Sequence, residues 1–108
     1  MQSFNCAEQI DQLLQSSLLT IMLFKTKHCS VCEAVQPQLV THLQQYPHIG
    51  SGYLYMEDAP ELASAYMIFT SPVVLLFYEG KEVYRAARFI RFAELDQQLQ
   101  RYSSLLDS

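Results

Sequence analysis

The sequence predicts a single α/β domain over residues 1–108, with a mixed central sheet of about four strands between two layers of helices. Three observations predict this fold. Helical and strand patterns alternate along the chain, one apolar run is continuous enough for a central strand buried on both faces, and a glycine turn joins two later strands. Half of the 108 residues are hydrophobic, which is enough to build one core.

The expected order is helix, strand, helix, strand, helix, strand, strand, helix. In residue numbers these elements are 5–15, 18–24, 30–46, 53–56, 58–66, 71–78, 81–85 and 92–106. Two β–α–β units would give parallel neighbours, and the closing hairpin would add one antiparallel strand.

In the first half, Asn5 and Glu8 have the spacing of a capping box at the start of a helix. The run 18–24 is almost entirely apolar, as in a central strand. Apolar residues then recur at helical spacing over 30–46, and Pro37 should kink this helix because it lacks a backbone donor.

In the second half, Gly50 and Gly52 suggest a loop before the next strand, and Asp58 with Glu61 suggests another capped helix. The turn at Gly80 predicts the hairpin. The last helix is amphipathic and carries Leu95, Leu99 and Tyr102. The aromatic residues are expected in core and strand packing, among them Tyr53, Tyr55, Phe69, Phe77, Tyr78 and Phe89.

The motif Cys29-Ser30-Val31-Cys32 stands where the apolar strand gives way to a helix. At a helix start, free backbone N–H groups and the helix dipole favour a thiolate, the species that attacks disulfides. The same spacing also serves zinc and iron–sulfur sites, so the motif alone leaves both chemistries open.

Composition and charge narrow the function classes. The net charge of −4 and scattered basic residues argue against a nucleic-acid partner. The longest apolar run, 18–24, is too short to cross a membrane, and the N-terminal residues lack a signal-peptide pattern. We therefore expect a cytoplasmic protein, where a dithiol is more often catalytic or metal-binding than structural.

Several separated features together resemble the thioredoxin family over nearly the whole chain. The cysteine pair follows an apolar strand, and Pro37 lies five residues after Cys32. Ser71-Pro72 precedes an apolar strand and a hairpin, as the cis-proline segment of that family does. The spacing from Pro72 to Gly80 and on to Leu95 is also similar. The resemblance implies a thioredoxin-like three-layer α/β/α sandwich.

The resemblance also implies roles. Cys29 would be the nucleophile and Cys32 the more buried resolving thiol. Pro72 would be cis and would bring the backbone of Thr70 and Ser71 beside Cys29, to bind an extended substrate segment. Substrates would be disulfide-bearing proteins or mixed disulfides of small thiols. A reductase or a small thiol would donate electrons, without an organic cofactor, a metal or a membrane.

The chain departs from the family at the site itself. His28 occupies the usual tryptophan position, and Leu23 replaces the buried aspartate expected to accept the proton of the second thiol. Water or Glu33 would then have to serve. Arg88 replaces a small glycine and would narrow the substrate groove, with Phe89 beside it.

Some residues keep two interpretations. His28 is either a cation that stabilises the Cys29 thiolate, helped by Lys25 or Lys27, or a solvated residue without a role. Arg88 either anchors an anionic small thiol or is an ordinary surface residue. Cys6 is expected to be a small core residue, with a third redox thiol as the alternative. Arg85 and Arg91 are expected to be solvated.

Three functions follow. The first is a thiol–disulfide oxidoreductase of the protein-disulfide reductase type. The second is a binding module that keeps the fold and has little turnover, which Leu23 and Arg88 favour. The third is a metal site in which Cys29 and Cys32 of two protomers share zinc or an iron–sulfur cluster.

Overall fold

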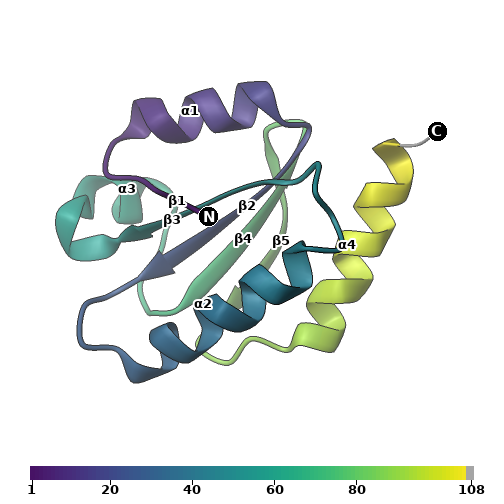
Figure 1. Ribbon diagram of the computed structural model, residues 1–108. Coiled ribbons are helices and arrows are strands. Elements are labelled where there is room, and N and C mark those ends of the chain that lie inside the picture. Colours follow the sequence, from purple (N-terminus) through teal and green to yellow (C-terminus); the bar gives the residue numbers. More distant parts are fainter. Residues whose placement is uncertain (107–108) are drawn as a thin grey trace.

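A computed structural model describes residues 1–106 and contains a five-stranded sheet covered by helices on both faces (Figure 1). Residues 107 and 108, which the predicted domain includes, lie outside the described residues. The elements are β1 (Gln2–Ser3), α1 (Ala7–Ser16), β2 (Leu19–Lys25), α2 (Ser30–Leu43), β3 (Gly50–Tyr55), the 3₁₀ turn η1 (Met56–Asp58), α3 (Pro60–Ala65), β4 (Val73–Tyr78), β5 (Lys81–Ala87) and α4 (Phe92–Leu106).

The strand order is β1-β3-β2-β4-β5, so the sheet is mixed, as predicted. β1, β3 and β2 are parallel, whereas β4 pairs with β2 in the antiparallel sense and β5 is antiparallel to β4. The prediction of about four strands missed β1, because an edge strand of two residues is too short to show a pattern.

The second predicted β–α–β unit is wrong. The chain leaves β3, passes through η1 and α3, and enters β4 at the same end of the sheet, where Phe24 pairs with Val73. With six residues, α3 spans about 9 Å, which is less than half of the roughly 20 Å length of a six-residue strand. The connection does not carry the chain back along the sheet, and β4 runs antiparallel to β2.

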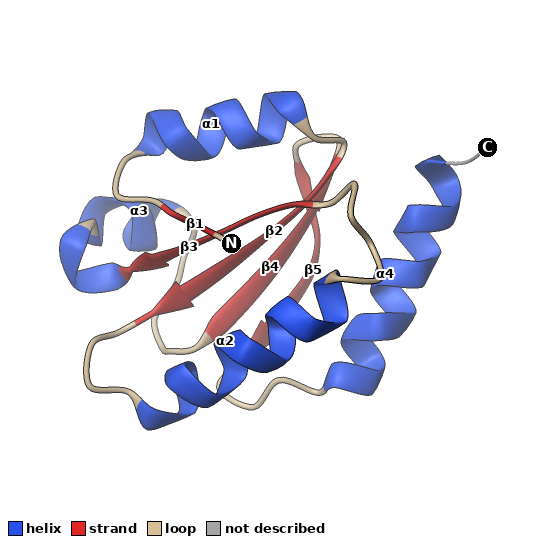
Figure 2. Cartoon of the chain, in the orientation of Figure 1, coloured by secondary structure: helices blue, strands red, loops and turns tan. Residues whose placement is uncertain are grey.

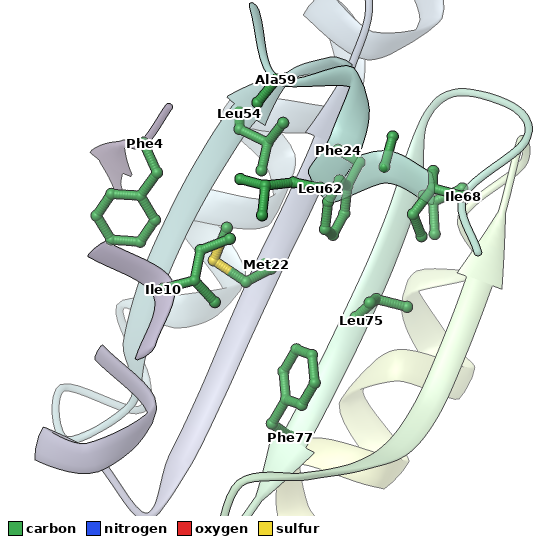
Figure 3. Packing of buried hydrophobic residues seen from close by; sticks show 12 residues of the cluster. Phe4, Ile10, Met22, Phe24, Leu54, Ala59, Leu62, Ile68, Leu75 and Phe77 are labelled. Carbon is green, nitrogen blue, oxygen red and sulfur yellow. The ribbon is translucent and has the colours of Figure 1, made fainter. Parts of the chain in front are cut away.

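The core lies on the two faces of the sheet, and Figure 2 shows the strands between the helices. One face packs against α1 and α3, and Figure 3 shows its side chains, including Phe24, Leu62 and Phe77. The other face packs against α2 and α4, with Leu39 and Leu99 among its members. Every residue of β2 is buried, which confirms the predicted central strand.

The two glycines predicted to form a loop lie inside β3 instead. A side chain at Gly52 would collide with the ring of Phe4, and one at Gly50 would come within 2.6 Å of the hydroxyl of Ser17. Glycine at these positions lets neighbouring side chains lie close against the strand. A sequence pattern does not distinguish such glycines from those of a turn.

Two predicted caps are also wrong. Helix α1 follows Cys6, and the Gln9 side-chain oxygen accepts the backbone N–H groups of Asn5 and Cys6 at 2.8 and 3.3 Å. Cys6 is half-buried at this cap and belongs to neither core cluster, contrary to the expectation of a core residue. Helix α3 starts at Pro60, because residues 56–58 form η1 first.

Helix α2 contains Pro37, as predicted, but ends at Leu43 rather than near Tyr46. Helix α4 has the predicted bounds, and both Leu95 and Leu99 are fully buried. Among residues 1–106, no helix is both long enough and apolar enough to span a membrane.

Candidate functional site

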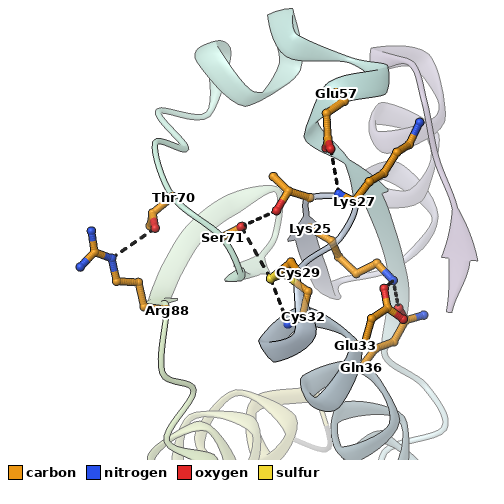
Figure 4. Close-up of a disulfide and its surroundings, with 11 residues drawn as sticks. Lys25, Lys27, Cys29, Cys32, Glu33, Gln36, Glu57, Thr70, Ser71 and Arg88 are labelled. Carbon is orange, nitrogen blue, oxygen red and sulfur yellow. Dashed lines mark hydrogen bonds and ion pairs between the residues drawn. A yellow bond between two sulfur atoms is a disulfide. The ribbon is translucent and has the colours of Figure 1, made fainter.

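The cysteine pair lies where α2 begins (Figure 4). Cys29 is the residue before the first helical turn, and Cys32 lies within that turn. The two are joined by a disulfide, with their Cα atoms 5.3 Å apart. Cys29 is half-buried and Cys32 fully buried, so Cys29 is the more accessible of the two to a partner.

The start of α2 favours negative charge on the first sulfur. The backbone N–H of Cys32 donates a hydrogen bond to the Cys29 Sγ at 3.2 Å, so this sulfur caps the helix. In the reduced protein the same donor and the helix dipole stabilise a thiolate over a thiol. His28 turns the chain into this position with a left-handed backbone, φ 61°, and its side chain is exposed.

The hydroxyl of Ser71 lies close to Cys29 and is itself bonded to the hydroxyl of Thr26. The Ser71 Oγ lies 3.9 Å from the Cys29 Sγ, and the Thr26 Oγ1 lies 2.7 Å from the Ser71 Oγ. The sequence predicted that the backbone of Ser71 lies beside Cys29. The structure shows that its side-chain hydroxyl also lies close to the Cys29 sulfur. Thr26 was missed, because nothing in the sequence links residues 45 positions apart.

The Ser71–Pro72 peptide bond is cis, as the resemblance implied. The carbonyl of Pro72 accepts the backbone N–H of Arg88 at 2.7 Å. The Arg88 Nε donates to the Thr70 Oγ1 at 3.2 Å, and Figure 4 shows its side chain turned toward Thr70 rather than toward the disulfide. Arg88 is therefore joined to the segment Thr70–Pro72, whose Ser71 lies beside Cys29.

The loops on either side of these residues expose two aromatic rings. Phe69 is 84% exposed and Phe89 79% exposed, so the prediction that both belong to the core is wrong. Both lie outside the strands, where the alternation of inward and outward side chains does not apply. Val31, between the cysteines, is also exposed.

Residue 23, where the resemblance to thioredoxins led us to look for a buried aspartate, is a leucine. Leu23 is fully buried among the apolar residues that α2 and α4 cover. Two positions along β2, Lys25 is only 2% exposed, and its ammonium lies 4.7 and 4.6 Å from the ring centres of Tyr53 and Tyr55. Leu23 thus supplies no proton acceptor for Cys32.

The lysines proposed to assist His28 are both engaged elsewhere. Lys25 contacts Glu33 at 3.4 Å and Gln36 at 2.5 Å. Lys27 binds Asp58 at 2.8 Å, and this hydrogen bond and charge raise the pKa of the lysine. Glu33, one of the expected routes for the Cys32 proton, is paired with Lys25.

Other predicted or considered residues lie outside this cluster. Arg85 is not simply solvated: it binds Glu82 and the backbone carbonyls of Tyr66 and Met67 at 2.7 to 2.9 Å. Arg91 is exposed, as predicted. Among the described residues, no group of three or more histidine, cysteine or acidic side chains could hold a metal ion.

Comparisons with known proteins agree with this geometry. The chain is 37% identical over 98 residues to the thioredoxin-like protein YdfQ of Bacillus subtilis, a match that covers 91% of this chain and 88% of that one. It is 24% identical over 90 residues to thioredoxin of Mycoplasma pneumoniae, with 83% and 88% covered. No protein-family model matches.

Solved thioredoxins share the fold. A thioredoxin variant from Halobacterium salinarum superimposes with a TM-score of 0.85 at 19% identity, covering 94% of this chain and 88% of that one. Thioredoxin of Fasciola hepatica gives 0.85 at 19% identity, with 94% and 99% covered. The identity to the Bacillus protein and the shared fold show that the chain belongs to the thioredoxin family. Its cysteine pair serves a thioredoxin-like redox function.

Proposed function

We propose that this protein is a thiol–disulfide oxidoreductase that reduces disulfides of proteins or mixed disulfides of small thiols. The observation that supports it most directly is the Cys29–Cys32 disulfide at the start of α2, with Cys29 half-buried and Cys32 fully buried. The cytoplasmic location and the absence of an organic cofactor stay predictions from the sequence.

The reaction begins with the Cys29 thiolate, whose proton has passed to solvent. Its sulfur attacks one sulfur of the substrate disulfide, forms a mixed disulfide and releases the other sulfur as a thiolate, which takes up a proton. Cys32 then loses its proton and attacks the Cys29 sulfur. This step releases the second substrate thiol and leaves the Cys29–Cys32 disulfide, so two electrons have passed to the substrate. A reductase or a small thiol then returns the pair to the dithiol.

Ser71 has a catalytic role in this scheme. Its hydroxyl faces the Cys29 sulfur, and Thr26 holds that hydroxyl in place. A hydrogen bond from Ser71 favours the charged thiolate. The backbone around Thr70 and Pro72 would pair with an extended substrate segment, in the manner of strand addition.

Resolution by Cys32 is the expected slow step. The sulfur is buried, and Leu23 offers no carboxylate to accept its proton. Glu33 is partly committed to Lys25, although its side chain remains 61% exposed. Water that enters when the substrate thiol begins to leave is therefore the acceptor we propose.

The test is a redox equilibration of the Cys29–Cys32 pair against glutathione buffers, read by the mass change on alkylation. The protein carries Cys6→Ser so that only two thiols are counted. A reversible two-electron transition supports the enzyme, and a potential near about −270 mV, the thioredoxin value, identifies a reductase. Two thiols that are alkylated in every buffer and never join would contradict it.

The second candidate is a binding module with little or no turnover, which the buried Leu23 favours. Its test is a double variant, Cys29→Ser with Cys32→Ser. A module would still bind its partners with unchanged affinity. An enzyme would lose the covalent complexes by which partners are captured.

A further inference from the structure

We propose that Phe69, Thr70, Arg88 and Phe89 form a recognition surface, here called the arginine–aromatic rim. This rim selects protein disulfides in which a carboxylate side chain stands next to the attacked cysteine. The inference rests on the proposed oxidoreductase function and adds the class of substrate to it. The exchange reaction is unchanged; the rim decides which disulfide is presented to Cys29.

The rim joins two loops, one of which continues into Ser71 beside the reactive sulfur. The Arg88 backbone N–H donates to the Pro72 carbonyl at 2.7 Å, and its Nε donates to the Thr70 Oγ1 at 3.2 Å. Between Thr70 and Pro72 stands Ser71, whose hydroxyl lies 3.9 Å from the Cys29 Sγ (Figure 4). A substrate segment whose cysteine reaches Cys29 therefore has its neighbouring residues at the rim.

The charge of Arg88 is available to a partner. Within residues 1–106, Lys25, Lys27 and Arg85 each pair with a carboxylate, whereas the side chain of Arg88 bonds only the neutral hydroxyl of Thr70. Arg88 is exposed, and its terminal N–H groups can bind a carboxylate with two parallel hydrogen bonds. The rim thus favours an acidic side chain.

The backbone at Arg88 supports a functional role. Its φ is 67°, in the left-handed region where glycine is favoured and a residue with a side chain is strained. Residues held in such conformations cluster at binding and active sites, where the side chain has a use. Phe89, the next residue, extends its ring into solvent.

The two rings favour a protein over a small thiol as the source of the carboxylate. Phe69 and Phe89 are 84% and 79% exposed, on the two loops that Arg88 joins. Large exposed apolar groups mark contacts with other macromolecules, and these two rings flank the Arg88–Thr70 contact. A small carboxylate thiol would engage Arg88 and leave both rings in water, whereas a polypeptide segment can cover them.

The experiment measures the rate at which Cys29 attacks three peptides. The peptides differ only in the residue next to their cysteine, which is glutamate, glutamine or lysine. Each peptide cysteine is joined to an aromatic thiol that leaves readily and absorbs light when released. The protein is reduced and carries Cys6→Ser and Cys32→Ser, so that attack is seen alone. We expect the glutamate peptide to react roughly fivefold faster than the glutamine peptide, the size of one exposed ion pair, and the lysine peptide to react slowest.

Arg88→Gln should abolish the preference, and Arg88→Lys should restore part of it. Arg101→Gln is the matched control, because Arg101 is an exposed arginine on α4, in contact with the Tyr102 ring. It should leave all three rates unchanged. Phe69→Ser with Phe89→Ser should slow every peptide but leave a small carboxylate disulfide unaffected.

The results separate the two proposals. Equal rates for the three peptides with the unsubstituted rim would overturn the inference. So would an Arg88→Gln effect equally large on a small carboxylate disulfide, combined with no effect of the two phenylalanine changes. Failure of the proposed function looks different, because the Cys29–Cys32 pair would then never close in the glutathione equilibration, whatever the peptide rates.

Discussion

The interior beneath the cysteine pair and the surface around it are built in opposite ways. Beneath, Leu23 and Cys32 are fully buried, and Lys25 is the charge closest to them along β2, held between two tyrosine rings. Around the pair, Phe69, Phe89 and Arg88 are exposed. The apolar side chains beneath the pair are thus buried in the core, whereas those around the pair are exposed and can be covered by a partner.

This contrast assigns different tasks to the two regions. The interior supplies stability and has Leu23 where an acid was expected, so we propose that Cys29 is activated by groups at the surface edge, the start of α2 and the hydroxyl of Ser71. The rim adds a cation and two rings that contribute little to the core. Changes beneath the pair should therefore alter stability, and changes around it should alter reactivity and partner choice.

The largest expected effect comes from the sulfurs themselves. Cys29→Ser should abolish disulfide reduction, because no nucleophile remains. Cys32→Ser should also stop turnover but leave a covalent mixed disulfide with the substrate, which mass spectrometry detects. A Cys32→Ser protein that turns over substrate at the normal rate would contradict the assigned roles, and Cys6→Ser serves as the control that should change nothing.

A pair of phenylalanines compares the regions directly. Phe24→Ala should lower the free energy of unfolding by about 3–5 kcal/mol, because it leaves a cavity in the core. Phe69→Ala should change it by no more than about 0.5 kcal/mol, since the ring is exposed. Denaturant titration followed by circular dichroism measures both. Equal losses would remove the distinction between interior and rim.

Leu23→Asp would put an acid into the apolar interior. We expect a loss of about 3 kcal/mol at neutral pH, because an unpaired carboxylate is costly there. Burial should raise the pKa of the new carboxyl, so the loss should be smallest near its unfolded value of about 4 and should grow as pH rises. Leu23→Asn is the control, with a loss that does not depend on pH. If the variant folds, its resolution step should be faster than that of the natural chain.

Ser71→Ala tests the surface side of the comparison. Removal of the hydroxyl should reduce the thiolate fraction of reduced Cys29 and slow its alkylation at neutral pH by about threefold, the effect of half to one kcal/mol from one hydrogen bond. Thr26→Val should give a smaller change in the same direction. Stability should change little in either variant. Unaltered alkylation rates in both would show that the hydroxyl pair does not act on Cys29.

The last prediction concerns Tyr84 on β5, outside the reactive pair. Burial first, and then the hydrogen bond to Glu94 at 2.9 Å, raise the pKa of Tyr84 to about 12. Because the folded pKa lies above the unfolded value of 10, the stabilising contribution is complete below pH 10 and is lost between about pH 10 and 12. The difference in unfolding free energy between the natural chain and Tyr84→Phe should shrink over that range. A difference that stays constant would contradict the shift.

Much of the fold and of the chemistry could be predicted from the sequence, because their signals are local. The continuous apolar run identified β2, helical spacing identified α2 and α4, and a dithiol at a strand-to-helix junction identified the reactive pair. The cysteine pair, Pro37 and Pro72, with their spacing along the chain, were enough to suggest the family, which the comparison with the Bacillus protein confirms.

What only the tertiary structure decided depends on residues that are distant in the sequence. The direction of β4 is set by where the connection through α3 returns to the sheet, and the glycines of β3 are explained by Phe4 and Ser17 packing against them. The pairing of Thr26 with Ser71, and of Arg88 with Thr70, brings together side chains 45 and 18 positions apart. A residue's type and spacing express its own preference, whereas burial, ion pairs and exposed rings depend on which neighbours the fold places beside it.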